Sequence, residues 1–470
     1  MKPSSQVPLE THAAIYSVSL IIIFKLVKTL FSNIPNLISH ATYQSFIIFL
    51  AGLCIRDKEL SAHGIAKFFG IKSHDSLTNM LYHKSWSASL LMLELLNQAI
   101  QVASNMNLQS WLIIDDVILP KSRSVNTEGV YWDYNYVDGK YILCIRLVVV
   151  AWSNGIIRIP VAFAPYYKKG SAYLETHHQK FRTKNQLAQI LVYQVFRKGL
   201  SFNYVTFDSW YASAENFNFF NRLNIKFIAG LKSNRNLRFI FNPIGNKPKR
   251  KTKNLKWYTL TCSEWAAQKP YVRDYSYYSK IDARARHELV FLKDVYFHLN
   301  LVCIKNYAKN NAFKDIHTKA DKRAKDPNKY LVTNDIYLTI PQIVSYYRSR
   351  WTIEVIFRDC KQQFALGKCQ AHKSIEPHLR HTAMVFFAFT LLEMMKSKVN
   401  CYDNSVHKTI GDIKRYLQNQ QLVYANGTYY IVDITKTNLD WDKVNYFAQV
   451  IDINNNSNKE TQLVFNFNFV

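Results

Sequence analysis

The chain has 470 residues, 48% of them apolar, which excludes an intrinsically disordered protein and allows two to four domains. Its 60 Lys and Arg residues exceed its 33 Asp and Glu residues, so the formal net charge is +27. This excess favours a polyanionic partner, most often nucleic acid. General solubility or binding to an anionic membrane surface would also account for such basicity.

The seven cysteines are scattered along the chain and form no CxxC pair, which indicates reduced thiols rather than a disulfide framework or a zinc module. No signal peptide is recognised. The apolar runs at 15–24 and 383–392 are too short to cross a membrane. We therefore expect a cytoplasmic protein without a membrane partner, in which the second run is a core helix.

The N-terminal part of the chain is expected to be helical and contains a helix-turn-helix pattern at 60–81. Ser61 can cap a first helix, and Gly70 separates it from a second one. The second helix would offer Lys72 and Asn79 to a DNA duplex. A plain helical hairpin would give the same pattern.

From residue 111 onward the pattern changes to strands and helices. The sequence predicts a strand at 111–114 that ends at Asp115–Asp116, and a strand at 203–207 that ends at Asp208. Between them lie two β-rich runs and an amphipathic helix, at 141–152, 155–167 and 181–200. This order favours an α/β sheet with a site at the carboxyl ends of its strands.

The block at 236–329 is β-rich and carries two cationic loops, at 245–257 and 305–329. These loops predict DNA binding that weakens as the salt concentration rises. The tail from residue 401 is polar and includes an Asn-rich stretch.

The run YYRSRWTIEVIFRDCK at 346–361 places four polar residues in the pattern Y-(2)-R-(3)-E-(6)-K. On a single α-helix these side chains fall within a sector of roughly 60°, and apolar residues form the opposite flank. A carboxylate among cations suits a metal-bound phosphate, although an ordinary amphipathic helix with a salt-bridged face is the alternative. The four polar residues are Tyr347, Arg350, Glu354 and Lys361, and the apolar ones are Ile353, Phe357, Cys360 and Phe364.

Three acidic positions have a setting that suits phosphoryl transfer. That reaction needs a deprotonated nucleophile and compensation of the charge on phosphate, which two Mg²⁺ ions held by oxygen ligands supply. The candidates are Asp115 or Asp116, Asp208 and Glu354. Each could instead be a helix cap, a turn residue or an ion-pair partner.

These pieces together resemble the DDE transposases of bacterial insertion sequences, in the group with the Y-(2)-R-(3)-E-(6)-K signature. The matching segments are IIDDVILPK, VTFDSWY and the stretch from LVTNDIY to QQFALG, at 113–121, 205–211 and 331–367. The resemblance spans the region from residue 55 to residue 395 and is most specific in the last segment.

The resemblance implies an α/β fold, namely an RNase H-like core with a β-rich insertion, preceded by an α-helical N-terminal domain. The expected division comprises a helical DNA-binding domain, the first part of the core, the basic insertion, the second part of the core, and a C-terminal region for dimerisation. Their respective boundaries are 1–105, 106–235, 236–329, 330–400 and 401–470.

The resemblance also implies roles for individual residues. Two Mg²⁺ ions, or Mn²⁺ in their place, would be bound by Asp115 or Asp116 together with Asp208 and Glu354. The signature residues Tyr347, Arg350 and Lys361 would contact DNA phosphates, while Trp210 and Tyr211 would either stack on a base or pack in the core.

An enzyme of this kind cleaves double-stranded DNA at the element ends and joins the 3′-hydroxyls to target DNA. We would then expect a homodimer in the DNA complex and a place at the bacterial nucleoid. The family commonly has Thr two residues after the first catalytic Asp, whereas Val117 and Ile118 follow the two aspartates here. This departure leaves open which aspartate binds metal. The alternatives are a decayed or domesticated DNA-binding protein and a stand-alone nuclease with the same core.

Overall fold

A computed structural model describes most of the chain. The described residues are 22–433 without 35–37, 71, 83–85, 123, 136–137, 240–257, 268–274, 311–325, 370–372, 403–408 and 426–427, together with the strand residues 449–452 and 464–465. Both expected cationic loops lie largely outside these residues. The first part of the apolar run at 15–24 also lies outside them.

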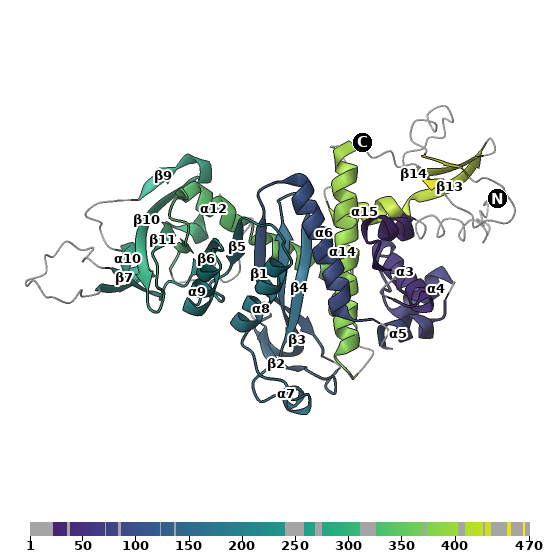
Figure 1. Cartoon of the computed structure of the whole chain (residues 1–470), viewed down its shortest axis with the longest axis horizontal. Helices are drawn as coiled ribbons and strands as arrows, with labels where there is room; N and C mark the ends of the chain where they lie inside the picture. The colour runs from purple at the N-terminus through teal and green to yellow at the C-terminus, as the bar shows by residue number, and fades with distance from the viewer. Residues whose placement is uncertain are drawn as a thin grey trace, which may run out of the picture. The chain divides into compact units, whose positions relative to one another are not determined.

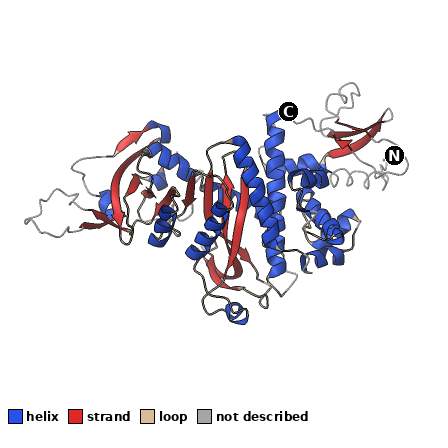
Figure 2. Cartoon of the chain, in the orientation of Figure 1, coloured by secondary structure: helices blue, strands red, loops and turns tan. Residues whose placement is uncertain are grey.

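The chain divides into two compact units. Figures 1 and 2 show the helices and strands that make up these units. Unit 1 consists of Met1–Glu94 and Asp359–Val470, and unit 2 consists of Leu95–Arg358. Two helices, α6 and α13, cross the boundaries between the units. The bounds of these helices are Ala88–Met106 for α6 and Trp351–Gln363 for α13.

Unit 1 contains the predicted helical N-terminal segment, with a helical stretch at 22–30 followed by α3 (His40–Ile55), α4 (Ala62–Phe69) and α5 (His74–Tyr82). The C-terminal part adds α14 (Glu376–Tyr402), α15 (Ile410–Gln418) and a sheet of β13 (Gln420–Ala425), β14 (Thr428–Asp433), β15 (Gln449–Asp452) and β16 (Val464–Phe465).

The predicted helix pair at 60–81 is confirmed as α4 and α5. The Ser61 side chain caps α4 by accepting a hydrogen bond from the Gly64 N–H at 3.1 Å. Gly70 ends α4 with a φ of 67°, a left-handed conformation that glycine adopts without steric strain. Ser73 accepts a bond from the Ser76 N–H at 3.2 Å at the start of α5. Local capping therefore sets both boundaries of this turn.

The apolar run at 383–392 is a core helix segment, as predicted, because every one of its side chains is buried within α14. In the part of the chain that the structure describes, no helix combines the length and apolarity needed to cross a membrane.

Unit 2 is built on a twelve-stranded mixed sheet with the order β2-β3-β1-β5-β6-β12-β11-β10-β7-β8, in which β4 also pairs with β3 and β9 with β10. Strand pairing is antiparallel between β1 and β3 and parallel from β1 through β5 to β6. The first strands are β1 (Trp111–Pro120), β2 (Tyr131–Asn135), β3 (Lys140–Ser153), β4 (Arg158–Tyr166), β5 (Tyr204–Phe207) and β6 (Phe227–Leu231).

The β-rich block continues this sheet. Its strands are β7 (Asn236–Phe239), β8 (Tyr258–Thr261), β9 (Ser276–Tyr278), β10 (Ala283–Leu292) and β11 (Leu299–Ile304), and β11 then pairs with β12 (Lys329–Thr333). A short helix and two 3₁₀ turns interrupt the block, namely α10 (Cys262–Ala267), η1 (Ser279–Ile281) and η2 (Tyr307–Lys309).

Helices of unit 2 connect or cover these strands. The capping box of Thr183 and Gln186 starts α8 (Lys184–Arg197), which packs against β3 and β4 as the amphipathic pattern predicts. Helix α12 (Ile340–Arg348) packs against β6, β10 and β12. Among the described residues, unit 2 also contains α7 (Ala172–Thr176) and α9 (Ala214–Arg222).

The strand predicted to end at Asp115–Asp116 is longer than expected. It runs on to Pro120, because β3 pairs with it along its whole length, with Asp115 opposite Val149 and Asp116 opposite Val148. The parallel pairing with β5 stops earlier, at Ile114 and Phe207. The two aspartates therefore lie inside β1, at the point where its parallel neighbour ends.

The prediction of one continuous helix for the Y-(2)-R-(3)-E-(6)-K run is wrong. Helix α12 ends at Arg348, and α13 begins at Trp351. The Ser349 hydroxyl donates to the Tyr346 carbonyl at 2.6 Å, an example of a serine side chain bonding locally to the helix backbone. As a result, Tyr347 does not share a helical face with Glu354. The apolar flank of α13 is buried, as predicted.

Candidate active site

Strand register brings two predicted site residues side by side. Ile114 of β1 is the parallel partner of Phe207 in β5, and the next residues along the two strands are Asp115 and Asp208. Parallel neighbours in a sheet lie roughly 4.8 Å apart. Two carboxylates that are 93 residues apart in the sequence therefore meet at one edge of the parallel pairing.

Glu354 joins this pair through a buried arginine. The Arg350 guanidinium donates to the Glu354 carboxylate at 2.5 Å and to the Asp115 carboxylate at 3.4 Å. Only 8% of Arg350 is exposed, so both interactions are shielded from solvent. One guanidinium thus bridges two of the three predicted acids. We call Asp115, Asp208 and Glu354 the acid cluster.

The acid cluster is an electrostatically strained environment for Asp115. Burial and the neighbouring Asp208 carboxylate raise the pKa of Asp115 well above its ordinary value, against the opposing effect of the Arg350 guanidinium. Asp116 and Glu354 raise this pKa further. An added cation at this position would relieve the repulsion between these charges.

The donor set of the acid cluster fits a hard divalent cation, because carboxylate oxygens are the ligands that Mg²⁺ and Mn²⁺ take in proteins. Among the residues that the structure describes, no three side chains of His, Cys, Asp or Glu already lie close enough to hold one ion. Residues from β1, from the end of β5 and from α13 would have to close further around an ion.

Asp116 has a different environment from its neighbour. Its carboxylate forms an ion pair with Arg146 of β3 and accepts hydrogen bonds from Lys184 Nζ at 3.0 Å and from the Tyr211 hydroxyl at 3.1 Å. Arg146 also pairs with Asp133 of β2 at 2.6 Å. Successive side chains of a strand point to opposite faces, which explains why two adjacent aspartates have separate partners. We call these five residues the Asp116 network.

The Asp116 network keeps its central carboxylate charged. Burial alone would raise the pKa of Asp116, but Lys184 and Arg146 outweigh burial, so the pKa of Asp116 lies below its ordinary value. Burial and the nearby Asp116 charge raise the pKa of the Tyr211 phenol well above its usual range. Tyr211 is therefore a neutral hydrogen-bond donor to an ionised acceptor.

The Asp208 carboxylate is oriented by its own turn. It accepts hydrogen bonds from the backbone N–H groups of Trp210 at 2.9 Å and of Tyr211 at 3.4 Å. The side chains of these two aromatic residues differ in exposure. Trp210 is 50% exposed, with Lys184 Nζ 4.5 Å and Lys232 Nζ 5.1 Å from its ring centroid, whereas Tyr211 is fully buried. Of the two, only Trp210 is accessible for stacking on a base.

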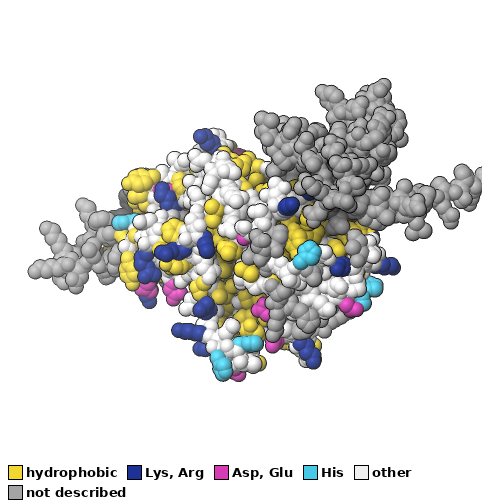
Figure 3. Space-filling view, turned by 45° about the vertical axis from the view of Figure 1, so that its right-hand side comes forward, with side chains coloured by type: hydrophobic (Ala, Val, Ile, Leu, Met, Phe, Trp, Pro, Cys, Tyr) yellow, Lys and Arg dark blue, Asp and Glu magenta, His cyan; other side chains and the backbone are white. Residues whose placement is uncertain are grey.

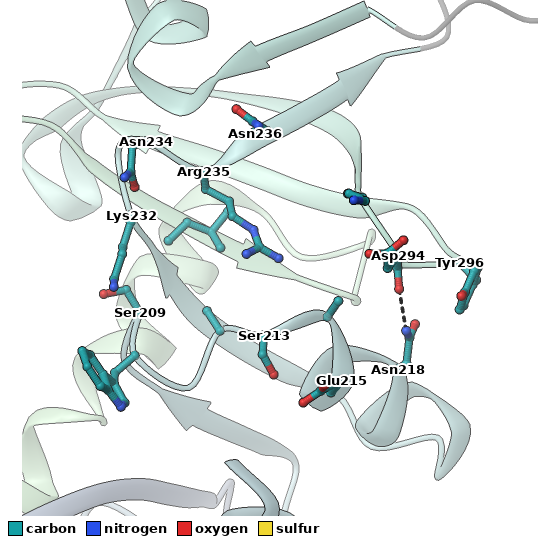
Figure 4. A pocket seen from close by; sticks show the side chains of 15 residues that line it. Ser209, Ser213, Glu215, Asn218, Lys232, Asn234, Arg235, Asn236, Asp294 and Tyr296 are labelled. Atoms are coloured by element: carbon teal, nitrogen blue, oxygen red, sulfur yellow. Dashed lines mark hydrogen bonds between the residues drawn. The ribbon is translucent and has the colours of Figure 1, made fainter. Parts of the chain in front are cut away.

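A cavity of about 840 Å³ opens beside this turn. Figure 4 shows Lys232 and Asn234 along one side of it, Arg235 reaching in from the end of the neighbouring strand, and Asn218 hydrogen-bonded to the Asp294 backbone on the far side. Trp210 lines the cavity as well. Amide and cationic side chains of the segment between β6 and β7 thus line the cavity next to the turn after Asp208.

The residues predicted to contact DNA have different exposures. Tyr347, which is 7% exposed, belongs to a hydrophobic cluster under the sheet, and Arg350 is engaged by the acid cluster. Lys361 lies about two turns beyond Glu354 on α13 and is exposed. Asn79 of α5 is exposed, and Lys72 is half-buried just before that helix. Figure 3 shows Lys and Arg side chains spread over the face that it draws.

Three members of the Asp116 network were missed by the sequence interpretation: Asp133, Arg146 and Lys184. One signal was present, since Arg146 is the only charged residue in the apolar run at 141–152. A lone charge inside a buried strand requires a buried partner of opposite charge. The identity of that partner could not be inferred from the pattern.

Two models of known protein families match the chain. The family described as DDE superfamily endonuclease matches residues 33–264, and the one described as transposase DDE domain matches residues 182–391. No curated protein matches the chain. The matches support the predicted assignment to the DDE transposases, a class of nuclease-type enzymes. Membership of the group with the Y-(2)-R-(3)-E-(6)-K signature stays a prediction.

Proposed function

We propose that this protein is the transposase of an insertion sequence. It would hydrolyse one DNA strand at each element end and then join the freed 3′-hydroxyl to target DNA. In the first reaction a water oxygen bonds to phosphorus as the bond to the 3′ oxygen breaks. In the second, the 3′-hydroxyl oxygen replaces the 3′ oxygen of a target phosphate. Two observations carry this proposal: Asp115 and Asp208 follow paired residues of adjacent strands, and Arg350 links Asp115 to Glu354.

The topology of unit 2 supports an RNase H-like core in this proposal. Antiparallel strands β4, β3 and β1 are followed by the parallel strands β5 and β6, with α8 between β4 and β5. The acids follow the end of the parallel pairing, where α/β sheets commonly place their active sites.

The acid cluster would hold two Mg²⁺ ions, with Mn²⁺ as a substitute. Bound there, such ions lower the pKa of the attacking water or hydroxyl and offset the charge of the scissile phosphate. Asp115 and Asp208 would contribute oxygen ligands from adjacent strands, and Glu354 from α13. Arg350 would fix the positions of the Glu354 and Asp115 carboxylates relative to each other.

Residues of both units are candidates for DNA contact. Trp210 offers an exposed ring for stacking on a base, with Lys232 supplying positive charge next to it. Lys361 is suited to a phosphate contact further along α13, and Lys72 and Asn79 to a duplex contact at α4–α5. Tyr347 is better placed for packing than for such a contact. Two copies of the chain would hold the paired ends.

The test is strand cleavage by the purified full-length chain. Inverted repeats that flank the coding region would supply the end sequence of the duplex, and Mg²⁺ or Mn²⁺ would be added. We expect cleavage by the wild type and its loss in Glu354→Gln and in Asp208→Asn, by on the order of a thousandfold. Gel analysis of end-labelled duplex measures both.

The exposed residue Glu175 on α7 provides the matched control, because Glu175→Gln removes the same kind of charge away from the acid cluster. That variant should cleave at the wild-type rate. Cleavage that survives Glu354→Gln or Asp208→Asn would contradict the proposed function.

A stand-alone nuclease is the second candidate, because one matching family is described as an endonuclease. The two candidates differ in the second reaction. A transposase joins a pre-cleaved 3′-hydroxyl end to a target plasmid, whereas a nuclease yields only hydrolysed strands. Supplying pre-cleaved ends and looking for joined products separates them.

A further inference from the structure

We propose that Asp116 is a positioning residue that fixes the Asp208 carboxylate through Tyr211 and Lys184. The inference rests on the proposed function, because it assigns a task to the residue next to a proposed ion ligand. Asp116 is connected to Asp208 in three steps, all within unit 2. The first two link Asp116 to the turn at Trp210 and Tyr211, and the third links this turn to the Asp208 carboxylate.

The first step is the bond between Asp116 and Tyr211. The Tyr211 hydroxyl donates to the Asp116 carboxylate at 3.1 Å, and the whole Tyr211 side chain is buried. A buried hydrogen bond to a charged acceptor is among the stronger ones in proteins. It holds the ring of Tyr211 against β1 and so restrains the backbone of the turn that carries it.

The second step uses Lys184 at the start of α8. Its ammonium group donates to Asp116 at 3.0 Å and lies 4.5 Å from the centroid of the Trp210 ring. A cation over an aromatic face is attracted to it. Asp116 therefore restrains Tyr211 directly and Trp210 indirectly, through Lys184. Two consecutive residues of the turn thus depend on one carboxylate.

The third step leads from the turn to the proposed ion ligand. The backbone N–H groups of the same two residues, Trp210 and Tyr211, donate to the Asp208 carboxylate. When the turn is fixed, both donors are fixed, and the orientation of Asp208 follows from them. A charge at Asp116 can thus act on Asp208 although the two side chains belong to different environments.

A second buried residue, Asn216 of α9, links the same turn to α8. Asn216 donates to the Tyr211 carbonyl at 2.8 Å and to Asn185 at 3.1 Å, and accepts from Gln189 at 2.8 Å. Asn216 is fully buried. The Asp208 turn is thereby attached to β1 through Tyr211 and to α8 through Asn216, which is the support that precise placement of a catalytic group requires.

The test compares Tyr211→Phe with the wild type. This change removes one hydroxyl and keeps the buried ring. In the DNA-free and ion-free protein, we expect amide hydrogen exchange at residues 208–212 to accelerate by about tenfold, because the turn loses one attachment. In the cleavage assay, we expect kcat to fall by about tenfold while KM for DNA stays within about twofold.

Tyr330→Phe is the matched control. Tyr330 is also buried, and its hydroxyl donates to the Asp326 carboxylate at 2.6 Å, remote in sequence from the Asp208 turn. That variant should leave exchange at 208–212 and kcat unchanged. A further pair of variants tests the second step, since Lys184→Arg keeps the cation and should retain most of the activity that Lys184→Met loses.

Unchanged exchange at 208–212 in Tyr211→Phe would overturn the inference, as would an equal acceleration in Tyr330→Phe. Wild-type kcat in Tyr211→Phe would overturn it as well. If the wild-type protein neither binds Mn²⁺ nor cleaves DNA, the proposed function fails, and the exchange measurement still decides whether Asp116 and Tyr211 hold the turn.

Discussion

Asp115 and Asp116 lie on opposite faces of β1, and the same type of side chain has a different electrostatic environment on each face. Asp115 faces other acids and has a raised pKa, whereas Asp116 faces two cations and has a lowered pKa. One residue of separation along a strand is enough for this difference, because consecutive side chains point to opposite faces. The comparison teaches that charge repulsion is concentrated on the face proposed for chemistry, while charge compensation is concentrated on the face that supports it.

The largest expected effect is the difference between the cleavage rates of Asp115→Asn and Asp116→Asn. Asp115→Asn removes a proposed ion ligand and should lower kcat by on the order of a thousandfold. Asp116→Asn weakens a supporting contact and should lower kcat by about 10–100-fold. Gel-based cleavage rates with Mn²⁺ measure both, and Mn²⁺ titration followed by electron paramagnetic resonance counts the bound ions.

The ion count sharpens this comparison. We expect Asp116→Asn to bind as many Mn²⁺ ions as the wild type, and Asp115→Asn to bind fewer. If Asp116→Asn loses an ion and Asp115→Asn does not, the two roles are interchanged and the proposed ligand set is wrong.

A smaller effect is expected on stability from the supporting face. Arg146→Ala leaves Asp116 with Lys184 and the Tyr211 hydroxyl as partners and removes the ion pair with Asp133. The free energy of unfolding should therefore fall by about 3 kcal/mol. Thermal unfolding of the ion-free protein measures the change. Arg222, exposed in the last turn of α9, offers the control.

For Arg222→Ala we expect a change within about 0.5 kcal/mol, as is usual for exposed positions. A midpoint for Arg146→Ala equal to that of the control would show that the Asp116 network contributes little to the stability of unit 2.

The smallest expected effect is a difference in pH dependence. The folded pKa of Asp115 lies above its ordinary value of 3.8, so its favourable contribution is fully present below that value and is lost as the pH rises through the folded pKa. The neutral variant Asp115→Asn avoids this loss. Its stability relative to the wild type should therefore increase with pH.

The contribution of Asp116 to stability changes with pH in the opposite direction. Its folded pKa lies below 3.8, so its contribution is present above that value and is lost only as the pH falls through the folded pKa. The deficit of Asp116→Asn should thus be constant above about pH 4. Unfolding midpoints from pH 4.5 to 8 measure both trends, at about 2–4 °C per kcal/mol. If the midpoints of the two variants, relative to the wild type, changed with pH in the same way, Asp115 and Asp116 would not differ in electrostatic environment.

Much of the local structure could be predicted from the sequence. The caps at Ser61 and Gly70, the strand before Asp208, the amphipathic helix after Thr183 and the buried flank of α13 all follow from propensity and periodicity. These features depend on residues within a few positions of one another, so a pattern in one segment is sufficient.

The sequence predicted Asp115 or Asp116 together with Asp208 and Glu354 as site residues. In the structure, Asp115 follows the partner of Phe207, and Arg350 links Asp115 to Glu354. Their role as ion ligands stays a prediction. The sequence could not decide which of Asp115 and Asp116 faces the other acids, because that choice depends on the pairing of β1 with β3 and β5. It also missed the break at Ser349, since the periodicity of 346–361 fits a continuous helix, whereas α12 ends at Arg348 and α13 begins at Trp351.

The sequence by itself determined which segments form helices and strands and which acids are available for chemistry. Only the tertiary structure decided which acids meet and which are neutralised. The decisive contacts join residues far apart in the chain: Asp116 to Tyr211 across 95 positions and Asp115 to Arg350 across 235. Pairings over such separations depend on the packing of the whole sheet with its helices, and no local period encodes them.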